Sequence, residues 1–202
     1  MYRSIVVVDA FYPDPHEVRN LALGCVYPEV TGQRSYPGRN SRKKFSPDGF
    51  DQMISYLIGE NVVGLDDMDS SHGRFRITLA GEETRWLVHV HPTYLGWVGV
   101  VYLNLPEHRQ GGTEFYRHRA FDSDRTPVTE AELQSTGAAS IVELLDRDGN
   151  DTSRWEHLMT VPTRFNRLVL YRPWLWHSAA EPFGDSPKNG RLIQLLSFVT
   201  TQ

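Results

Sequence analysis

The chain of 202 residues carries 21 Lys and Arg against 25 Asp and Glu, a net charge of −4 at pH 7, and 40% of its residues are hydrophobic. This is enough apolar material for one core, so we expect a single domain over residues 1–202. The acidic balance offers no basic field for phosphate groups, which argues against nucleic acid and anionic membranes as partners. Cys25 is the only cysteine, so no internal disulfide can form, as suits a cytoplasmic protein.

The first 60 residues predict helical support for the domain. Residues 4–11 form a β-branched run typical of a strand, and Asp14-Pro15 then supplies a helix cap and a proline suited to the first turn of a helix that runs to about Gly24. Residues 34–45 are rich in Gly, Pro, Ser and charge and predict a loop. A second helix is expected over residues 50–59.

Short strand patterns dominate from residue 73 onward. None is followed by the helical crossover that a parallel sheet needs, so the pattern predicts a mainly β protein with flanking helices (α+β) whose core is an antiparallel double sheet over 73–202. The expected strands are residues 73–81, 85–92, 96–105, 111–119, 166–173 and 191–199.

A helical insertion is expected to interrupt these strands over about 121–160. Residues 131–149 and 151–162 show helical periodicity, with Thr129 and Asp151 as capping residues. Insertions of this length between strands are often lids or substrate loops.

Three histidines form a candidate metal site. His89 and His91 stand two residues apart in RWLVHVHP, and side chains at i and i+2 of a strand point to the same side. His177, after the apolar segment YRPWLW, supplies a third imidazole. Three neutral imidazoles suit Fe, Cu, Zn or Ni and leave positions open for substrate or oxygen. Solvated, capping or structural roles are expected for the other histidines: His16, His72, His108, His118 and His157.

The order of motifs resembles that of the iron(II) and 2-oxoglutarate dependent dioxygenases, in particular the prolyl-hydroxylase-like branch. The sequence reads HVHP, then VVYLN, GGTEFY, NRLVLYRPWLWHSA and GRLIQLLSFV. The resemblance covers about residues 85–199 apart from the insertion, and extends more loosely to VVVDAFYPDPHEVRNLAL. It implies a double-stranded β-helix core, that is, a jelly roll of the kind cupins also have.

The resemblance also implies roles for individual residues. His89 and His177 match the two metal-ligating histidines of the family. Tyr102 matches the tyrosine that hydrogen-bonds 2-oxoglutarate, and Arg191 matches the basic residue that pairs with its distal carboxylate. A guanidinium group suits this role because it is always charged and can hold a carboxylate through two hydrogen bonds.

One position departs from the family pattern. Where the family has the aspartate of a two-histidine, one-carboxylate triad, this sequence has His91. A neutral imidazole there leaves the metal site one unit more positive and fills the space that halide occupies in halogenating members. Glu114 is an alternative source of a carboxylate ligand.

The resemblance therefore implies a non-haem metal-dependent oxygenase that uses Fe(II), 2-oxoglutarate and O2 to hydroxylate, or otherwise oxidise C–H bonds of, a small-molecule or amino-acid-like substrate. Cu or another divalent metal is an alternative to Fe(II). Two other functions stay open: a cupin-like three-histidine enzyme that acts without 2-oxoglutarate, and a catalytically inactive binding module. An exposed edge strand would allow the protein to form a homo-oligomer. No segment has the roughly 20 consecutive apolar residues that a membrane-spanning helix needs.

Overall fold

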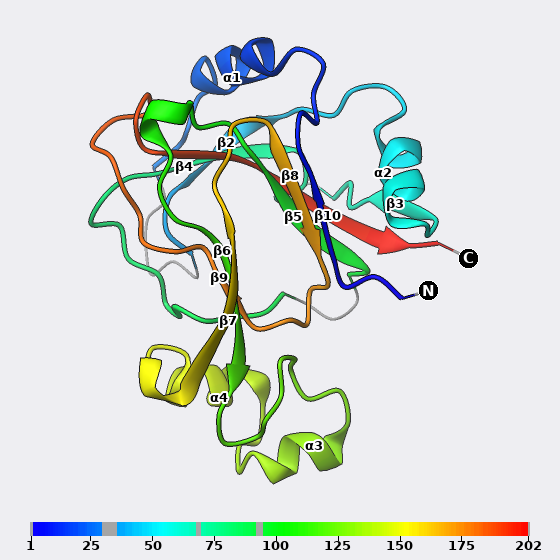
Figure 1. The fold of residues 1–202 in the computed structure, drawn as a ribbon, viewed down its shortest axis with the longest axis vertical. Coiled ribbons are helices and arrows are strands. Elements are labelled where there is room, and N and C mark those ends of the chain that lie inside the picture. The colour runs from blue at the N-terminus through cyan, green and yellow to red at the C-terminus, as the bar shows by residue number, and fades with distance from the viewer. Residues whose placement is uncertain (1, 30–35, 68–69, 92–94, 202) are drawn as a thin grey trace.

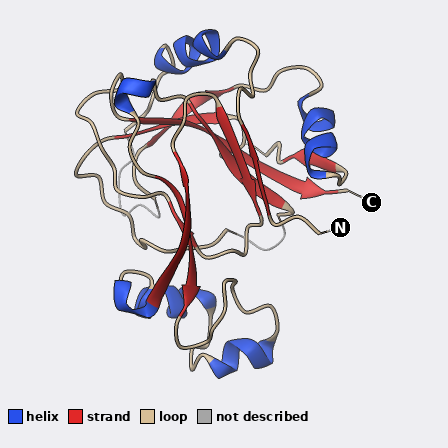
Figure 2. Cartoon of the chain, in the orientation of Figure 1, coloured by secondary structure: helices blue, strands red, loops and turns tan. Residues whose placement is uncertain are grey.

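Two antiparallel β-sheets form the centre of the molecule in the computed structural model, which describes residues 2–29, 36–67, 70–91 and 95–201 (Figures 1 and 2). The strands are β1 (Ile5–Val8), β2 (Arg39–Lys44), β3 (Val62–Gly64), β4 (Arg74–Thr78), β5 (Trp97–Tyr102), β6 (Gly112–His118), β7 (Trp155–Pro162), β8 (Arg167–Tyr171), β9 (His177–Ser178) and β10 (Arg191–Thr200). The helices are α1 (Pro15–Leu23), α2 (Phe50–Ile58), α3 (Glu130–Ser135) and α4 (Ile141–Asp148), with short 3₁₀ turns at Pro106–His108 and Thr152–Arg154.

The larger sheet has its strands in the order β1-β8-β5-β10-β4-β2, and β3 also pairs with β10. The smaller sheet has the order β7-β6-β9. Strand β10 lies centrally in the larger sheet because both of its faces are apolar: Leu192 and Leu196 point to one side, and Ile193 to the other. A strand that is covered on both faces carries a continuous apolar run rather than an alternating one.

The two faces of the larger sheet contribute to different cores. One face packs against α1 and α2, through residues that include Val18, Ala22 and Ile54 from the helices and Leu192 from β10. The other face packs against the smaller sheet: Val100 and Tyr102 of β5, Val169 and Tyr171 of β8 and Ile193 of β10 cluster with Phe115 of β6 and Val161 of β7. Groups with catalytic potential on this inner face therefore lie between the two sheets.

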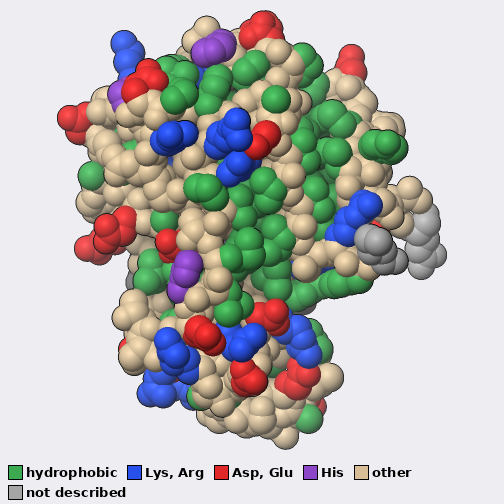
Figure 3. All heavy atoms as spheres, viewed as in Figure 1, with side chains coloured by type: hydrophobic (Ala, Val, Ile, Leu, Met, Phe, Trp, Pro, Cys, Tyr) green, Lys and Arg blue, Asp and Glu red, His purple; other side chains and the backbone are tan. Residues whose placement is uncertain are grey.

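The insertion forms a lobe beyond the far end of β6 and β7 (Figure 1). Leu144 and Leu145 of α4 pack with Trp155 and Trp176 in a third apolar cluster. Gly137, at φ +71°, separates α3 from α4. Charged side chains gather on the surface of this lobe (Figure 3).

A buried hydrogen bond between an imidazole and a carboxylate ties the lobe to the smaller sheet. Nε2 of His118, the last residue of β6, lies 3.0 Å from Oδ2 of Asp148, the last residue of α4. Both side chains are at most 2% exposed. Arg147 adds a second contact to the same carboxylate at 2.8 Å.

The two helices predicted in the first 60 residues are confirmed. Helix α1 begins at Pro15, where the Asp14 side chain accepts a hydrogen bond from the Glu17 backbone N–H at 3.1 Å. Helix α2 ends at Gly59, whose φ of +74° suits glycine. Among the described residues, no helix is long and apolar enough to cross a membrane.

Three predictions of secondary structure are wrong. Residues 39–44, which lie in the expected loop, form strand β2. Among the described strands β2 pairs with β4 alone, at the edge of the larger sheet. An edge strand can carry charged side chains in place of alternating apolar and polar ones. The predicted helix at 151–162 is mostly strand β7, another edge strand, opposite an irregularity in β6 between Phe115 and Tyr116. The predicted strand at 85–92 has only one β-bridge, at His89. Strands β1, β2 and β3 show that the segment before residue 73 also contributes to the sheet.

Replacing Leu192 by Ala should lower the free energy of unfolding by about 2–5 kcal/mol, because this fully buried side chain leaves a cavity between β10 and the helices. Urea denaturation measures the loss. Val63→Ala is the matched control, since Val63 is 41% exposed, and should change stability by less than about 0.5 kcal/mol. Equal effects of the two substitutions would contradict this account of the core.

Candidate metal centre

The backbones of His89 and His177 form the framework of the site. The His89 N–H donates to the His177 carbonyl oxygen at 2.9 Å, and the His177 N–H donates to the His89 carbonyl oxygen at 3.1 Å. Two residues that exchange both hydrogen bonds are directly opposite in an antiparallel pair, with their side chains on the same face. This local pairing brings together imidazoles that are 88 positions apart in the chain (177 minus 89).

His91 joins them by the extended geometry of the next two residues. Its N–H donates to the Pro173 carbonyl oxygen at 2.8 Å, which continues the contact between the two segments beyond the single β-bridge. The spacing of two residues then points His91 to the side of His89, as predicted. The three imidazoles therefore come together although residues 89–91 do not form a regular strand.

The three imidazoles lie within reach of one metal ion. One ring nitrogen from each of His89, His91 and His177 can be chosen so that all three lie within 4.8 Å of one another. The ring centroids of His89 and His177 are 4.3 Å apart, and those of His91 and His177 are 4.9 Å apart. In the described part of the chain this is the one cluster of three or more His, Cys, Asp or Glu side chains with such geometry.

Hydrogen bonds to the backbone orient two of the rings. Nδ1 of His177 lies 2.8 Å from the Leu175 carbonyl oxygen, and Nδ1 of His89 lies 3.4 Å from that of Leu87. A carbonyl accepts, so each Nδ1 carries the proton and each Nε2 keeps its lone pair. Nε2 of His177 is buried with no hydrogen-bond partner. Such an atom fits a metal ligand, because an imidazole nitrogen that is buried and unpaired is otherwise costly.

The surroundings keep the three imidazoles neutral. Removal from water lowers the pKa of His89 to about 4; the bond to the Leu87 carbonyl opposes this shift, and the charges of Arg76 and Arg191 reinforce it. Removal from water and the neighbouring His89 and Arg76 lower the pKa of His91 to about 3. Burial, and then the two other histidines, hold the pKa of His177 well below its ordinary value. Neutral imidazole is the form that binds metals.

Tyr102 and Arg191 lie on the same inner face of the larger sheet. The Tyr102 hydroxyl is 2.6 Å from Oγ1 of Thr113 on β6, so it bridges the two sheets. The Arg191 guanidinium carbon lies 5.9 Å from the centroid of the Tyr102 ring, and its Nε is buried without a hydrogen-bond partner. The structure thus brings the two predicted 2-oxoglutarate contacts together in the interior.

Asn104 fixes the backbone on both sides of Arg191. Its Nδ2 donates to the Gly190 carbonyl oxygen at 2.7 Å, and its Oδ1 accepts from the Leu192 N–H at 3.0 Å. Asn104 is fully buried. The YLN motif therefore contributes a side chain that holds the start of β10, a role beyond the turn chemistry that an asparagine after a strand suggests.

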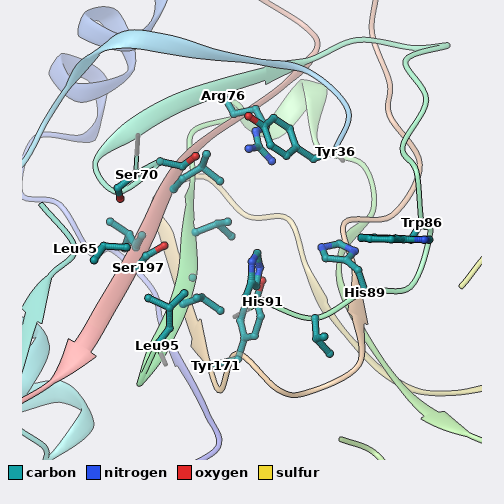
Figure 4. A pocket seen from close by; sticks show the side chains of 17 residues that line it. Tyr36, Leu65, Ser70, Arg76, Trp86, His89, His91, Leu95, Tyr171 and Ser197 are labelled. Carbon is teal, nitrogen blue, oxygen red and sulfur yellow. The ribbon is translucent and has the colours of Figure 1, made fainter. Parts of the chain in front are cut away.

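A cavity of about 320 Å³ opens beside His89 and His91 (Figure 4). Sequence patterns did not identify several of its polar and aromatic lining residues, which are Tyr36, Ser70, Arg76, Trp86 and Tyr171. The ring of Tyr171 lies 4.7 Å from that of His177. The only signal for Arg76 is a charged residue inside the strand RFRIT, at a position that alternates with buried apolar ones.

Two other sequence candidates lie elsewhere. Glu114 accepts hydrogen bonds from the Tyr116 hydroxyl and from Ser178 Oγ at 3.0 Å, and it is absent from the three-histidine cluster. Of the tryptophans near the motifs, Trp97 belongs to the core under the helices, and Trp176 to the core of the insertion. Trp86 is the tryptophan that lines the cavity.

Comparison with solved structures defines the class of the fold. HygX from Streptomyces hygroscopicus, with nickel, 2-oxoglutarate and hygromycin B bound, is similar with a TM-score of 0.55 and 11% sequence identity, over 98% of this chain and 83% of that one. A second HygX structure, with nickel and 2-oxoglutarate bound, gives 0.51 and 10% over the same shares. The chain therefore shares the overall fold of HygX. A family model matches residues 2–194, and the chain belongs to that family, DUF6445, a family of unknown function. No curated protein sequence matches the chain.

The metal-free protein should lose stability as the pH falls from about 6.5 toward 4. The unfolded chain takes up protons near the ordinary imidazole pKa of 6.5, whereas His89 and His91 in the folded chain stay neutral down to about 4 and 3. Above 6.5 both states are neutral, and these residues add no pH dependence. Urea titrations between about pH 7.5 and 4.5 measure the slope, which His91→Gln should reduce; an identical slope in the variant would contradict the assignment.

Asn104→Ala should lower the free energy of unfolding by about 1–3 kcal/mol, because it leaves the Gly190 carbonyl and the Leu192 N–H without their buried partner. Urea denaturation measures this loss. The exposed Asn61 is the matched control, and Asn61→Ala should change stability by less than about 0.5 kcal/mol. A neutral effect of Asn104→Ala would show that the start of β10 does not depend on this side chain.

Proposed function

We propose that the protein is a non-haem metal-dependent oxygenase of the Fe(II) and 2-oxoglutarate type that oxidises a small-molecule or amino-acid-like substrate. The observation that carries the proposal is the convergence of His89, His91 and His177, with Nε2 of His177 buried and unpaired. The similarity of the fold to HygX, which has been solved with nickel and 2-oxoglutarate bound, supports it. We also place the chain in the prolyl-hydroxylase-like branch, on the order of its motifs.

In this proposal the three histidines are the metal ligands. Nε2 of His89, Nε2 of His177 and a ring nitrogen of His91 would hold Fe(II), and the cavity that His89 and His91 line would give substrate access to it. Bound Fe(II) and 2-oxoglutarate would together supply the activation of O2 that C–H oxidation requires. Because all three ligands are neutral, the metal would keep its full charge, which favours anionic groups in the open positions.

Arg191 and Tyr102 would orient the keto acid. The Arg191 guanidinium group would bind its distal carboxylate, and the Tyr102 hydroxyl, already positioned by Thr113, would donate a hydrogen bond to it. Both groups are buried, so they would act in a site from which water is largely excluded. The Asn104 contacts hold Arg191 in place before the ligand arrives.

The proposal extends to the architecture. We propose that the two sheets are the halves of a double-stranded β-helix within one domain over residues 1–202, with the site between them. The insertion at about 121–160 would serve as a lid, since its apolar cluster includes Trp176, the neighbour of His177. A lid protects reactive chemistry from bulk water.

Anaerobic loading with Fe(II), followed by 2-oxoglutarate, tests the proposal. The wild type should develop the weak visible metal-to-ligand charge-transfer band of a chelated keto acid. Arg191→Ala should weaken 2-oxoglutarate binding by about 2–5 kcal/mol, or roughly thirtyfold or more, because it removes the charged partner of a buried carboxylate.

Two controls separate the alternatives. The metal content of each variant distinguishes an enzyme from an inactive binding module, which would hold no stoichiometric metal. A band that is absent from the wild type but present in His91→Asp would favour a cupin-like enzyme that acts without 2-oxoglutarate. Unchanged 2-oxoglutarate affinity in Arg191→Ala would remove Arg191 from the binding site.

A further inference from the structure

The cavity beside the histidines contains a second arginine with no anionic partner. Arg76 lies on β4 opposite Ile193 of β10, so its side chain shares the inner face with Arg191. Figure 4 shows Arg76 and Tyr36 on one side of the cavity, and His89 and His91 on another. Burial lowers the pKa of Arg76 to about 10, and the nearby charge of Arg191 adds to this shift.

Neutral groups hold Arg76 in position. Its Nε donates to Oδ1 of Asn40 at 2.7 Å, and its guanidinium carbon lies 3.7 Å from the centroid of the Tyr36 ring. Among the described residues, no carboxylate forms an ion pair with Arg76 or Arg191.

Two buried arginines elsewhere in the chain are compensated, whereas Arg76 is only partly buried and still has no counter-charge. The Arg172 guanidinium group bonds to the carboxylate of Glu60, and that of Arg19 donates to the carbonyl oxygens of Leu103 and Lys188. Taking a cation out of water without a counter-charge is unfavourable, and it is retained chiefly where a ligand supplies the charge. Arg76 is prepared for an anion that the described protein does not provide.

The charges of the proposed site require more than the keto acid. A divalent metal with three neutral ligands and two guanidinium groups exceeds the two negative charges of 2-oxoglutarate by two. Arg191 lies beside Tyr102 in the interior, whereas Arg76 lines the cavity together with Tyr36, Ser70 and Trp86. The two guanidinium groups therefore face different spaces.

We propose that Arg76 binds the carboxylate of the substrate, so that the enzyme acts on a small organic acid whose apolar part lies along Leu65, Leu95 and Trp86. The statement that the bound acid is oxidised rests on the proposed function. The statement that Arg76 binds its carboxylate rests on the cavity alone. The planar guanidinium group can accept a carboxylate in two parallel hydrogen bonds, while the Tyr36 ring and Asn40 keep it oriented. The remaining lining is mainly apolar, which suits a hydrocarbon or aromatic body.

A fragment screen on the full-length protein tests this assignment. The protein is loaded with Zn(II) as a diamagnetic metal and with 2-oxoglutarate, and screened by ligand-observed NMR against small aromatic and aliphatic carboxylic acids, each paired with its primary amide. The acids should bind at least about tenfold more tightly than their amides. Arg76→Gln should abolish this preference, and Arg76→Lys should keep part of it, because the charge remains while the planar fork is lost.

Arg42→Gln is the matched control, since it removes the same charge from an exposed position on β2 outside the cavity and should leave the preference intact. Thermal unfolding checks that Arg76→Gln is folded, and calorimetry measures 2-oxoglutarate binding separately. Equal binding of acids and amides, no binding of any acid, or an unchanged preference in Arg76→Gln would overturn the inference. So would weakened 2-oxoglutarate binding in Arg76→Gln, because Arg76 would then belong to the keto acid. If 2-oxoglutarate fails to bind but the acid preference and its loss in Arg76→Gln are seen, the proposed function fails and the recognition by Arg76 stands.

Discussion

The reciprocal backbone hydrogen bonds between His89 and His177 are the constraint on which the rest of the site depends. They place the two imidazoles on the same face of the paired segments, with ring centroids 4.3 Å apart, and the spacing of two residues adds His91. The pairing also joins the irregular segment before β5 to the edge of the smaller sheet. In a metal site of this kind, backbone hydrogen bonds rather than side-chain contacts set the relative positions of the ligands.

Electrostatics accounts for the second feature of the site. The interior between the sheets holds three imidazoles that stay neutral and two arginines that stay charged, with Tyr102 and Tyr171 between the sheets as neutral polar groups. Burial raises the pKa of Tyr102 above its ordinary value, so it remains a hydrogen-bond donor. The described interior is thus suited to bind negative charge before any ligand is present. A buried Arg191 is consistent with this, because an anionic ligand would supply its counter-charge.

The sequence predicted the elements that are determined by their own residues, such as a helix with a capping residue or a strand with a continuous apolar run. Asp14 and Pro15 start a helix wherever they occur before an apolar face, and the runs in β5, β8 and β10 are apolar because both of their faces are covered. Edge strands β2 and β7 escaped prediction, since an edge strand has one open side and carries no alternation. The convergence of the three histidines followed from spacing and motif order. Arg76 did not, because its importance arises from lying on the same inner face as Arg191, on the neighbouring strands β4 and β10, a relation that only the strand register of the sheet creates.

The hydrogen bond between His118 and Asp148 divides the insertion into two parts of different freedom. Helix α4 is tied to the end of β6 by side chains that are almost fully buried, so moving it would leave the buried Asp148 carboxylate without this partner, which is costly. Residues 121–126 are attached as well: the His118 N–H donates to the Ser123 carbonyl oxygen at 2.8 Å, and the Trp176 N–H donates to the Asp124 carbonyl oxygen at 3.1 Å. Helix α3, by contrast, has no buried residue. Helix α3, Glu130–Ser135, is therefore the portion of the insertion in which sequence can be exchanged while the histidine geometry stays intact, and a chimaera made there would alter the outer lobe alone.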